Sequence, residues 1–489
     1  MTIPNALLDR TSRTKIVATL GPSSSSPEII EKLVLAGMNV ARINASHGDH
    51  AGHAETIRAV RAAAESTGRT VGILLDLQGP KIRIGDFTHP PREVSQGDTL
   101  VLAVNREPEG DELPTDYAAL DTDVEVGQRL LIDDGQLGAV VTDVQPGSVH
   151  CRALDEGVIR PRKGINLPDT MVSAPSLSER DRADARFAVE QGVDLIALSF
   201  VRQAADVEEL REFLVAAGRD IPIVAKIEKP QALDNLESIL RASWGVMVAR
   251  GDLGVELSPE QVPMAQKRII HTARRLLRPV ITATQMLESM TRQPRPTRAE
   301  ASDVANAVLD GSDAVMLSGE TAVGRFPIES VEMMQRIIRS TRRFRSSDGG
   351  LARRRERNID TKPDAVADAA CTVAYHLRAH AIVAFTQSGM SAILAAARRP
   401  DTPILAFTNN EAVRNSLALV WGVDSFRLTD VEDTDTLVRN LDKTLIDRGL
   451  AKRGDRLVVL MGAPTMRMGP TNLMLVYEVK NYWEEQPEE

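Results

Sequence analysis

Two short apolar runs near the middle of the sequence each end abruptly in charged side chains. Residues 223–225 are followed by Lys226 and Glu228, and residues 246–249 by an Arg-Gly-Asp triplet that ends at Asp252. Alternation along a strand places Lys226 and Glu228 on one face, with the residue between them turned away. Two carboxylates at neighbouring strand ends can hold a divalent cation, and an ammonium beside them suits an oxyanion or a phosphoryl group. A single charge at a strand end is usually just solvated, whereas three that converge favour a catalytic site.

Polar side chains also follow four further predicted strands. Arg42, Asn44 and Ser46 share one parity at the end of the second strand, which supplies donors for phosphate and oxygen ligands for a monovalent cation. The third strand ends in Asp76 and is followed by Lys81 and Arg83, the seventh ends at Thr284, and the eighth at Ser318. His47 could act as a general base, but no carboxylate stands at motif spacing, which favours a structural hydrogen-bonding histidine.

Short β-branched runs alternate with amphipathic helical stretches, which is typical of a parallel α/β architecture. The runs predict strands at 15–19, 40–43, 71–76, 195–199, 223–226, 245–249, 280–283 and 314–317, with a last helix at 327–341. Eight such units close a (β/α)8 TIM barrel, whose active site lies at the carboxyl ends of the strands. An open doubly wound sheet is the alternative, and the eight even units make it less favourable.

One connection is anomalous, because roughly a hundred residues separate Asp76 from the helix expected near Ser178. This stretch is rich in Gly, Asp and Thr, with short alternating runs at 99–102 and 129–132. It predicts a small β domain inserted after the third strand, at the catalytic end of the barrel, where an insertion can act as a lid.

The barrel pattern ends near Arg345, and a polar segment at 346–362 with three consecutive arginines is typical of a linker. Strands at 381–385, 404–407 and 457–460 then alternate with helices, which predicts a second α/β domain. The predicted domains are 1–79 and 176–345 for the barrel, 80–175 for the inserted β lid domain, and 346–489 for the C-terminal α/β domain.

The composition limits the class of protein. A chain of 489 residues with 43% apolar and 26% charged residues is typical of a soluble protein of two to four domains. The net charge of −9 argues against a nucleic-acid surface. With only Cys151 and Cys371 there is no disulfide framework, and the N-terminus has no apolar run typical of a signal peptide. We therefore expect a cytoplasmic protein with no membrane partner.

Five segments together resemble the signature motifs of the pyruvate kinase family. They are 41–48, 223–228, 247–256, 283–290 and 295–324, the last including Arg-Pro-Thr-Arg-Ala-Glu-Ala-Ser-Asp-Val-Ala-Asn and Leu-Ser-Gly-Glu-Thr. The resemblance extends from Arg13 through the C-terminal domain, and motifs of this length are far more specific than a lone glycine-rich loop. It implies a barrel, a lid insertion and a C-terminal regulatory domain, which matches the organisation predicted from the residues.

The resemblance implies transfer of the phosphoryl group of phosphoenolpyruvate to ADP, which needs positioning and charge neutralisation more than covalent help. It implies that Glu228 and Asp252 hold Mg²⁺ or Mn²⁺ and that Lys226 neutralises the phosphoryl group in the transition state. The groups that it places on the substrate or among the catalytic residues are Arg42, Gly251, Asp252, Thr284 and Ser318. Those that it places on the nucleotide are Asn44, Ala45, Ser46, His47, Arg83 and Lys163, the last carried in by the lid.

The sequence departs from the family's better-known pattern after the third strand. Where potassium-requiring members read Asp-Thr-Lys-Gly-Pro-Glu, residues 76–81 read Asp-Leu-Gln-Gly-Pro-Lys. The implied potassium ligands are Asn44, Ser46, Asp76 and Leu77, the last through its backbone only. Lys81 supplies the unit charge that K⁺ would bring, so we expect that K⁺ is not required. A solvated hinge lysine is the alternative.

A strand-to-helix turn at 386–391 matches the family's effector phosphate loop. It consists of Thr386, Gln387, Ser388, Gly389, Met390 and Ser391, and such a turn can bind an anion. Gln387 and Met390 stand where members activated by sugar bisphosphates carry cations. We therefore expect a monophosphate effector such as AMP or a sugar monophosphate, and the resemblance implies a homotetramer.

Two other functions are compatible with parts of the pattern. A Mg²⁺-dependent barrel lyase acting on an enolate of pyruvate or oxaloacetate would use the same two carboxylates. It would need neither Lys163 nor contact between Lys226 and a phosphoryl group. A metabolite sensor built on an inactive barrel is opposed by the intact Lys226, Glu228, Asp252 and Thr284.

Overall fold

Eight parallel strands form a closed barrel in the order β1-β16-β15-β14-β13-β12-β3-β2. The structure is a computed structural model that describes residues 13–87, 91–347, 361–428, 434–462 and 470–480. The barrel strands are β1 (Lys15–Thr19), β2 (Val40–Asn44), β3 (Gly72–Asp76), β12 (Leu195–Leu198), β13 (Ile223–Ile227), β14 (Gly245–Ala249), β15 (Val280–Ala283) and β16 (Ala314–Leu317). The predicted TIM barrel is confirmed, and each predicted strand agrees with the observed one to within one residue at either end.

The barrel strands are apolar without alternation because both of their faces are covered. Ile16, Val17 and Ala18 of β1 are completely buried, as are Val246 and Val248 of β14. Strands of a parallel barrel face side chains inside and helices outside, so both parities must be apolar. This is why the charged residues stand out at the strand ends.

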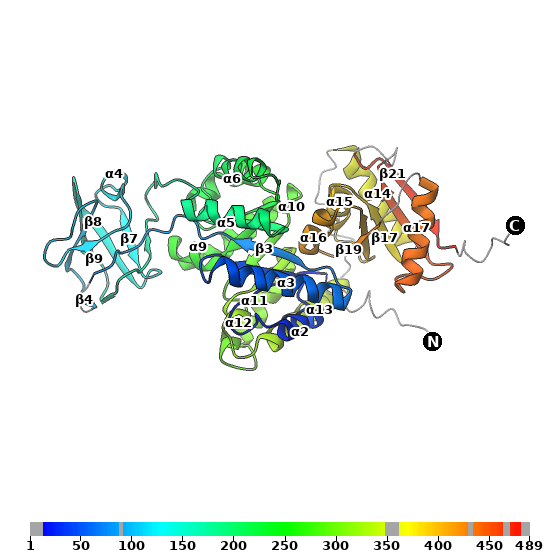
Figure 1. Cartoon of the computed structure of the whole chain (residues 1–489), viewed down its shortest axis with the longest axis horizontal. Coiled ribbons are helices and arrows are strands. Elements are labelled where there is room, and N and C mark those ends of the chain that lie inside the picture. Colours follow the sequence, from blue (N-terminus) through cyan, green and yellow to red (C-terminus); the bar gives the residue numbers. More distant parts are fainter. Residues whose placement is uncertain (1–12, 88–90, 348–360, 429–433, 463–469, 481–489) are drawn as a thin grey trace. The chain divides into compact units, whose positions relative to one another are not determined.

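The chain divides into two compact units. Unit 1 comprises Met1–Leu75, Glu190–Ile196 and Ile270–Glu489, and unit 2 comprises Asp76–Val189 and Ala197–Ile269. The barrel helices of unit 1 are α2 (Pro27–Ala36), α3 (His50–Thr67), α11 (Arg298–Asp310), α12 (Gly319–Ala322) and α13 (Pro327–Ser347), with the short η2 (Glu288–Thr291). Figure 1 shows α2 beside α3 and α13, and α2 packs against both of them.

Unit 2 carries the helices that surround β13 and β14 in the sequence. They are α5 (Glu179–Glu190), α6 (Ala204–Ala216), α7 (Pro230–Asp234), α8 (Leu236–Ala242), α9 (Arg250–Glu256), the short η1 (Pro259–Gln261) and α10 (Val262–Arg275), which runs on into unit 1. Within the described residues no helix combines the length and apolar character that a membrane crossing requires.

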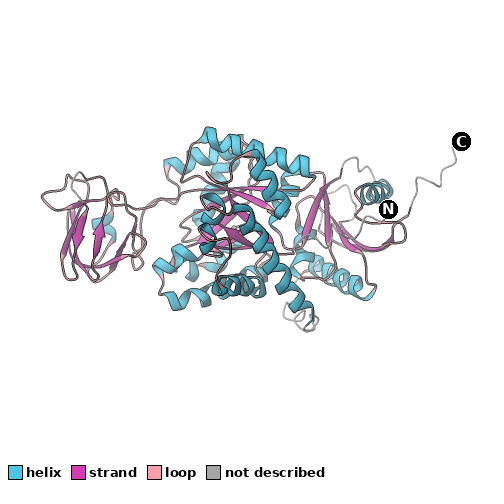
Figure 2. Cartoon of the chain, turned by 90° about the horizontal axis from the view of Figure 1, so that it is seen from below, coloured by secondary structure: helices cyan, strands magenta, loops and turns pink. Residues whose placement is uncertain are grey.

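The segment between β3 and α5 folds into two small sheets, built almost wholly of strands and turns (Figure 2). One has the order β11-β7-β8-β9-β5-β6 and the other is β10-β4. Their elements are β4 (Arg92–Val94), β5 (Thr99–Ala103), β6 (Leu113–Pro114), α4 (Leu120–Asp123), β7 (Arg129–Ile132), β8 (Leu137–Gln145), β9 (Ser148–Ala153), β10 (Gly157–Ile159) and β11 (Ile165–Asn166). Alternate residues such as Leu100, Leu102 and Leu130 are fully buried in a core of their own. We call this segment the lid.

The C-terminal part of unit 1 contains a five-stranded sheet in the order β19-β18-β17-β20-β21. Its elements are α14 (Lys362–His376), β17 (Ala381–Phe385), α15 (Met390–Ala397), β18 (Ile404–Thr408), α16 (Glu411–Ser416), η4 (Leu417–Leu419), β19 (Val423–Arg427), α17 (Thr434–Asp447), β20 (Arg456–Met461) and β21 (Leu473–Glu478). The predicted α/β fold is correct, but the sequence did not indicate β19 or the antiparallel β21. The predicted linker begins two residues inside α13, and residues 348–360 of it lie outside the described residues.

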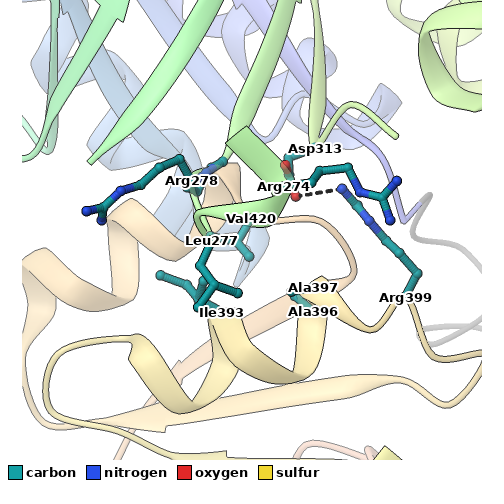
Figure 3. A pocket seen from close by; sticks show the side chains of 10 residues that line it. Arg274, Leu277, Arg278, Asp313, Ile393, Ala396, Ala397, Arg399 and Val420 are labelled. Atoms are coloured by element: carbon teal, nitrogen blue, oxygen red, sulfur yellow. Dashed lines mark ion pairs between the residues drawn. The ribbon is translucent and has the colours of Figure 1, made fainter. Parts of the chain in front are cut away.

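The amino ends of β1 and β16 hold this C-terminal sheet through buried polar contacts. Lys15 Nζ donates to the carbonyl of Val423 at 2.7 Å, and Arg399 pairs with Asp313 at 3.1 Å (Figure 3). The Arg399 guanidinium also lies 4.7 Å from the ring centre of Trp421. The cavity beside Arg399 is about 20 Å³, which is room for one water, so this junction is packed rather than open to a ligand.

Candidate active site

Lys226 and Glu228 lie side by side at the carboxyl end of β13. Lys226 Nζ is 2.8 Å from Glu228 Oε1, and the side chain of Ile227 between them is fully buried. The Glu228 side chain is 1% exposed, and its Oε2 accepts the backbone N–H of Phe200 at 2.7 Å. The shared face that strand alternation predicts is therefore observed.

Two further groups surround the Lys226 ammonium. Asp76, at the end of β3, lies 3.3 Å from it, and Ser199 Oγ accepts its hydrogen bond at 2.7 Å. Ser199 in turn donates to the carbonyl of Leu77 at 2.7 Å. Three strand ends thus position one lysine, and a lysine held this way keeps its charge at a fixed point.

Burial and the charge of Asp252 raise the pKa of Glu228, with Lys226 acting in the opposite direction. Asp252 and Gly251 lie in the first turn of α9, directly after β14. Two carboxylates close enough to repel each other fit a divalent cation, which would remove that repulsion. In the described part of the chain no three His, Cys, Asp or Glu side chains form a complete cage.

The lid holds two lysines with two consecutive carboxylates. Lys163 Nζ lies 2.9 Å from Asp133 Oδ1, and Lys81 Nζ lies 3.6 Å from Asp134 Oδ1. Asp133 and Asp134 have φ of 55° and 54°, and Gly135 follows with φ of 82°. Successive left-handed residues are typical of the turn of a β-hairpin, here the one that joins β7 to β8. The sequence pattern did not indicate this turn, although it directly follows the predicted strand 129–132.

A small cavity lies between the lid and the strand ends of unit 2. Its volume is about 40 Å³, and Lys81, Asp134, Arg202, Lys229 and Asp252 are among its lining residues. Arg83 lies on the adjoining lid connection, where its backbone N–H donates to Asp116. Charged groups of both signs therefore face one small space in unit 2.

In unit 1, Arg42 is oriented by a hydroxyl on the neighbouring strand. Its Nη1 donates to Thr19 Oγ1 at 3.0 Å, and Thr19 donates to the carbonyl of Leu317 at 2.9 Å. After Arg42 the chain turns, because Asn44 Oδ1 accepts the backbone N–H of Ser46 at 3.2 Å. Ala45 within this turn is buried, and His47 after it is exposed.

Thr284 and Ser318 directly follow β15 and β16, and each has an unusual feature, one in its backbone and one in its hydrogen bonding. Thr284 has φ of 69°, which is rare for a β-branched residue and marks strain that packing must support. Ser318 Oγ is buried and finds no hydrogen-bond partner among the described residues. Glu320, whose pKa burial raises, accepts the backbone N–H groups of Ser318 and Leu287 at 2.8 and 2.9 Å. A buried hydroxyl left unsatisfied at a strand end is suited to contact a ligand.

The turn at 386–391 is preformed before α15. Gly389, with φ of 86°, donates its N–H to Thr386 Oγ1 at 2.8 Å, and Ser391 Oγ lies 2.6 Å from Thr471 Oγ1. Gln387, Ser388 and Met390 are exposed. Hydroxyls and amides, with no cation from the turn itself, therefore line it.

Comparison with known proteins places both halves of the chain. The family model described as pyruvate kinase, barrel domain, matches residues 11–331, and that described as pyruvate kinase, alpha/beta domain, matches residues 364–477. Pyruvate kinase of Mycobacterium intracellulare is 48% identical over 469 residues, covering 96% of this chain and 98% of that protein. The enzyme of Corynebacterium glutamicum is 48% identical over 467 residues, covering 95% and 97%. A crystal structure of a pyruvate kinase from Cryptosporidium parvum superposes with a TM-score of 0.91 at 35% identity and covers 97% of both chains.

Proposed function

Because the chain belongs to the pyruvate kinase family, we propose that the Lys226–Glu228 strand end of the barrel is where it does its chemistry. The family relation makes it a phosphotransferase that moves the phosphoryl group of phosphoenolpyruvate to ADP, giving pyruvate and ATP. The observation that carries the assignment is Lys226, whose side chain is 12% exposed and is held at 3.3 Å or less by Asp76, Glu228 and Ser199.

Glu228 and Asp252 would hold the divalent cation. Family members use Mg²⁺, and the raised pKa of Glu228 beside Asp252 supports a cation between these two carboxylates. When bound, such a cation supplies Lewis-acid stabilisation of negative charge on the substrate oxygens. Both ligands sit on elements fixed by the barrel, which keeps their geometry constant through turnover.

The other groups of the site would handle substrate charge. Lys226 neutralises the transferring phosphoryl group, and Arg42, aligned by Thr19, adds a second cation for the same group. The backbone of Gly251 and Asp252 receives the substrate carboxylate. Thr284 and the unsatisfied hydroxyl of Ser318 order the groups or water that deliver the proton to the enolate.

The nucleotide would be bound by residues of both the barrel and the lid. We assign Asn44, Ala45, Ser46, His47, Arg83 and Lys163 to it. Lys163 is at present paired with Asp133, so nucleotide phosphates must compete with that carboxylate for the ammonium. This exchange gives the lid a physical reason to respond to nucleotide.

Members of the family generally use K⁺ as well, and we propose that this chain does not need it. Lys81 replaces the glutamate of potassium-requiring members and brings a fixed positive charge to the segment that begins at Asp76. In the structure its ammonium pairs with Asp134 of the lid turn.

We further propose regulation through the 386–391 turn and assembly into a homotetramer in the cytoplasm. The turn leads into α15. Arg399, two residues after the end of that helix, forms an ion pair with Asp313, which directly precedes β16 (Figure 3). A ligand bound at the turn would therefore change the position of β16 through this ion pair. The edge strand β21 exposes Leu473, Leu475 and Val476, an apolar strand edge that a second copy of the chain would cover.

A coupled assay tests the proposed function. Pyruvate formed from phosphoenolpyruvate is reduced by lactate dehydrogenase, with and without ADP, in parallel with direct measurement of ATP. Equal amounts of pyruvate and ATP, both strictly dependent on ADP, support phosphoryl transfer. Pyruvate formed from oxaloacetate without nucleotide would instead support the lyase.

A further inference from the structure

A buried ion pair joins the two elements that carry the proposed metal ligands. Lys229, which follows Glu228, pairs with Glu256, which stands four residues after Asp252 on α9. The side chain of Glu256 is 1% exposed and that of Lys229 13%. Residues four apart on a helix share one face, so Glu256 lies on the same side of α9 as Asp252.

Glu256 is only half satisfied by this arrangement. Its Oε1 accepts from both Lys229 Nζ and Asn166 Nδ2, the latter at 2.8 Å. Its Oε2 is buried and has no hydrogen-bond partner in the part of the chain that the structure describes. A buried ion pair with an unsatisfied oxygen is a poor source of stability, so stability alone does not account for it.

Lys229 is also linked to the metal ligand through Phe200. Its ammonium lies 5.9 Å from the Phe200 ring centre, and the Phe200 N–H donates to Glu228 Oε2. Phe200 holds a φ of 55°, which is strained for an aromatic residue. The pair is therefore in contact with the group that orients Glu228.

We propose that Lys229 and Glu256 are positioning residues that form a charge-neutral tie and set the affinity of the metal site. This rests on the assignment of Glu228 and Asp252 as the metal ligands. With both charges present the tie has almost no net field at the cation. Lys229 alone would repel a dication, and Glu256 alone would act as a third nearby carboxylate and attract it. With both charges present, the affinity therefore stays at the value that Glu228 and Asp252 give, and loss of either charge shifts it.

The test measures the Kd of Mn²⁺ for the full chain in the absence of substrates. The electron paramagnetic resonance signal of free Mn²⁺ monitors this binding. Glu256→Gln, which keeps an acceptor for Asn166, should raise the Kd about tenfold, and Lys229→Met should lower it several-fold, since the uncompensated unit charge that remains repels or attracts the dication. The double variant Lys229→Met/Glu256→Gln should return to within about twofold of the unmodified protein. Single variants that shift the Kd in the same direction, or a double variant whose Kd stays as far from that of the unmodified protein as the Kd of Glu256→Gln, overturn the proposal.

Control variants show whether a change in the Kd comes from the lost charge or from disturbed packing. Asn166→Ala removes a neutral partner of the same carboxylate and should leave the Kd within about twofold; a shift as large as that of Glu256→Gln overturns the charge argument. Glu112→Gln breaks an ion pair with Arg106 (2.6 and 2.8 Å) in the lid and should change nothing. If Lys229→Met does not fold, Lys229→Gln takes its place. Glu228→Gln must abolish tight binding; if it does not, the metal assignment itself fails, independently of the tie.

Discussion

Lys226 Nζ and Glu228 Oε1 are 2.8 Å apart at the end of one barrel strand, so an ammonium and the carboxylate that we propose as a metal ligand share a single element. This spacing lets one strand address both the phosphoryl group and the oxygens that a divalent cation binds. The adjacent Asp76 and Ser199 hold the ammonium from two other strands. Preorganised charge of this kind costs no rearrangement when the substrate arrives.

The proposed metal ligands Glu228 and Asp252 give the first prediction. Glu228→Gln and Asp252→Asn each remove one anionic ligand without changing side-chain volume much. Apparent Mg²⁺ affinity and turnover should both fall, by about a hundredfold or more. Steady-state rates over a wide range of Mg²⁺ concentration measure this, and near-normal turnover at low Mg²⁺ in either variant would exclude the assignment.

The lid turn predicts that substitutions of Lys163 and of Asp133 change the KM for ADP in opposite directions. Lys163→Ala should raise KM for ADP about tenfold and leave KM for phosphoenolpyruvate almost unchanged. Asp133→Asn keeps a residue that tolerates the left-handed backbone but removes the competing carboxylate of Lys163. It should lower KM for ADP about two- to fivefold, as expected for a partly exposed pair. A rise in that KM would show that Asp133 instead positions Lys163 for binding.

The effector turn predicts a monophosphate. With Gln387 and Met390 exposed and uncharged, fructose 1,6-bisphosphate should activate poorly, whereas AMP or a hexose monophosphate should make the phosphoenolpyruvate curve less sigmoidal. Ser388→Ala should weaken that activation and leave the maximal rate unchanged. Curves that become hyperbolic only with fructose 1,6-bisphosphate would contradict this account.

Lys81 predicts independence from potassium. In buffer that contains an organic counter-cation and neither K⁺ nor Na⁺, the enzyme should turn over phosphoenolpyruvate and ADP. Added KCl should change this turnover at most about threefold. Lys81→Glu should lose most activity without K⁺ and regain a substantial part with it. A steep, saturable requirement for K⁺ in the unmodified protein would make Lys81 an ordinary hinge residue.

The barrel strands were predictable because each is a continuous apolar run bounded by charge, and a closed barrel needs eight of them. The strands β19 and β21 were not, for different reasons. β19 carries Asp424 and Ser425 in its middle, and β21 is an exposed edge with little buried surface to impose a pattern.

In the candidate site, too, some contacts were predictable from the sequence and others were not. The placement of Lys226 beside Glu228 follows from strand alternation, so the sequence predicts it directly. The contact of Lys226 with Ser199, and the pairing of Lys163 with Asp133, join elements distant in sequence. No local pattern encodes them. The positive φ of Thr284 is likewise imposed by packing, against the residue's own preference.

The most direct test of the account is Lys226→Met, measured in two reactions of the same enzyme. If Lys226 neutralises the transferring phosphoryl group, turnover of phosphoenolpyruvate with ADP should fall by about a thousandfold or more, while substrate binding through the divalent cation is largely retained. Exchange of solvent protons into pyruvate, which requires an enolate but no phosphoryl transfer, should fall far less. An equal loss of both reactions would contradict the account and would show that Lys226 serves substrate binding or folding.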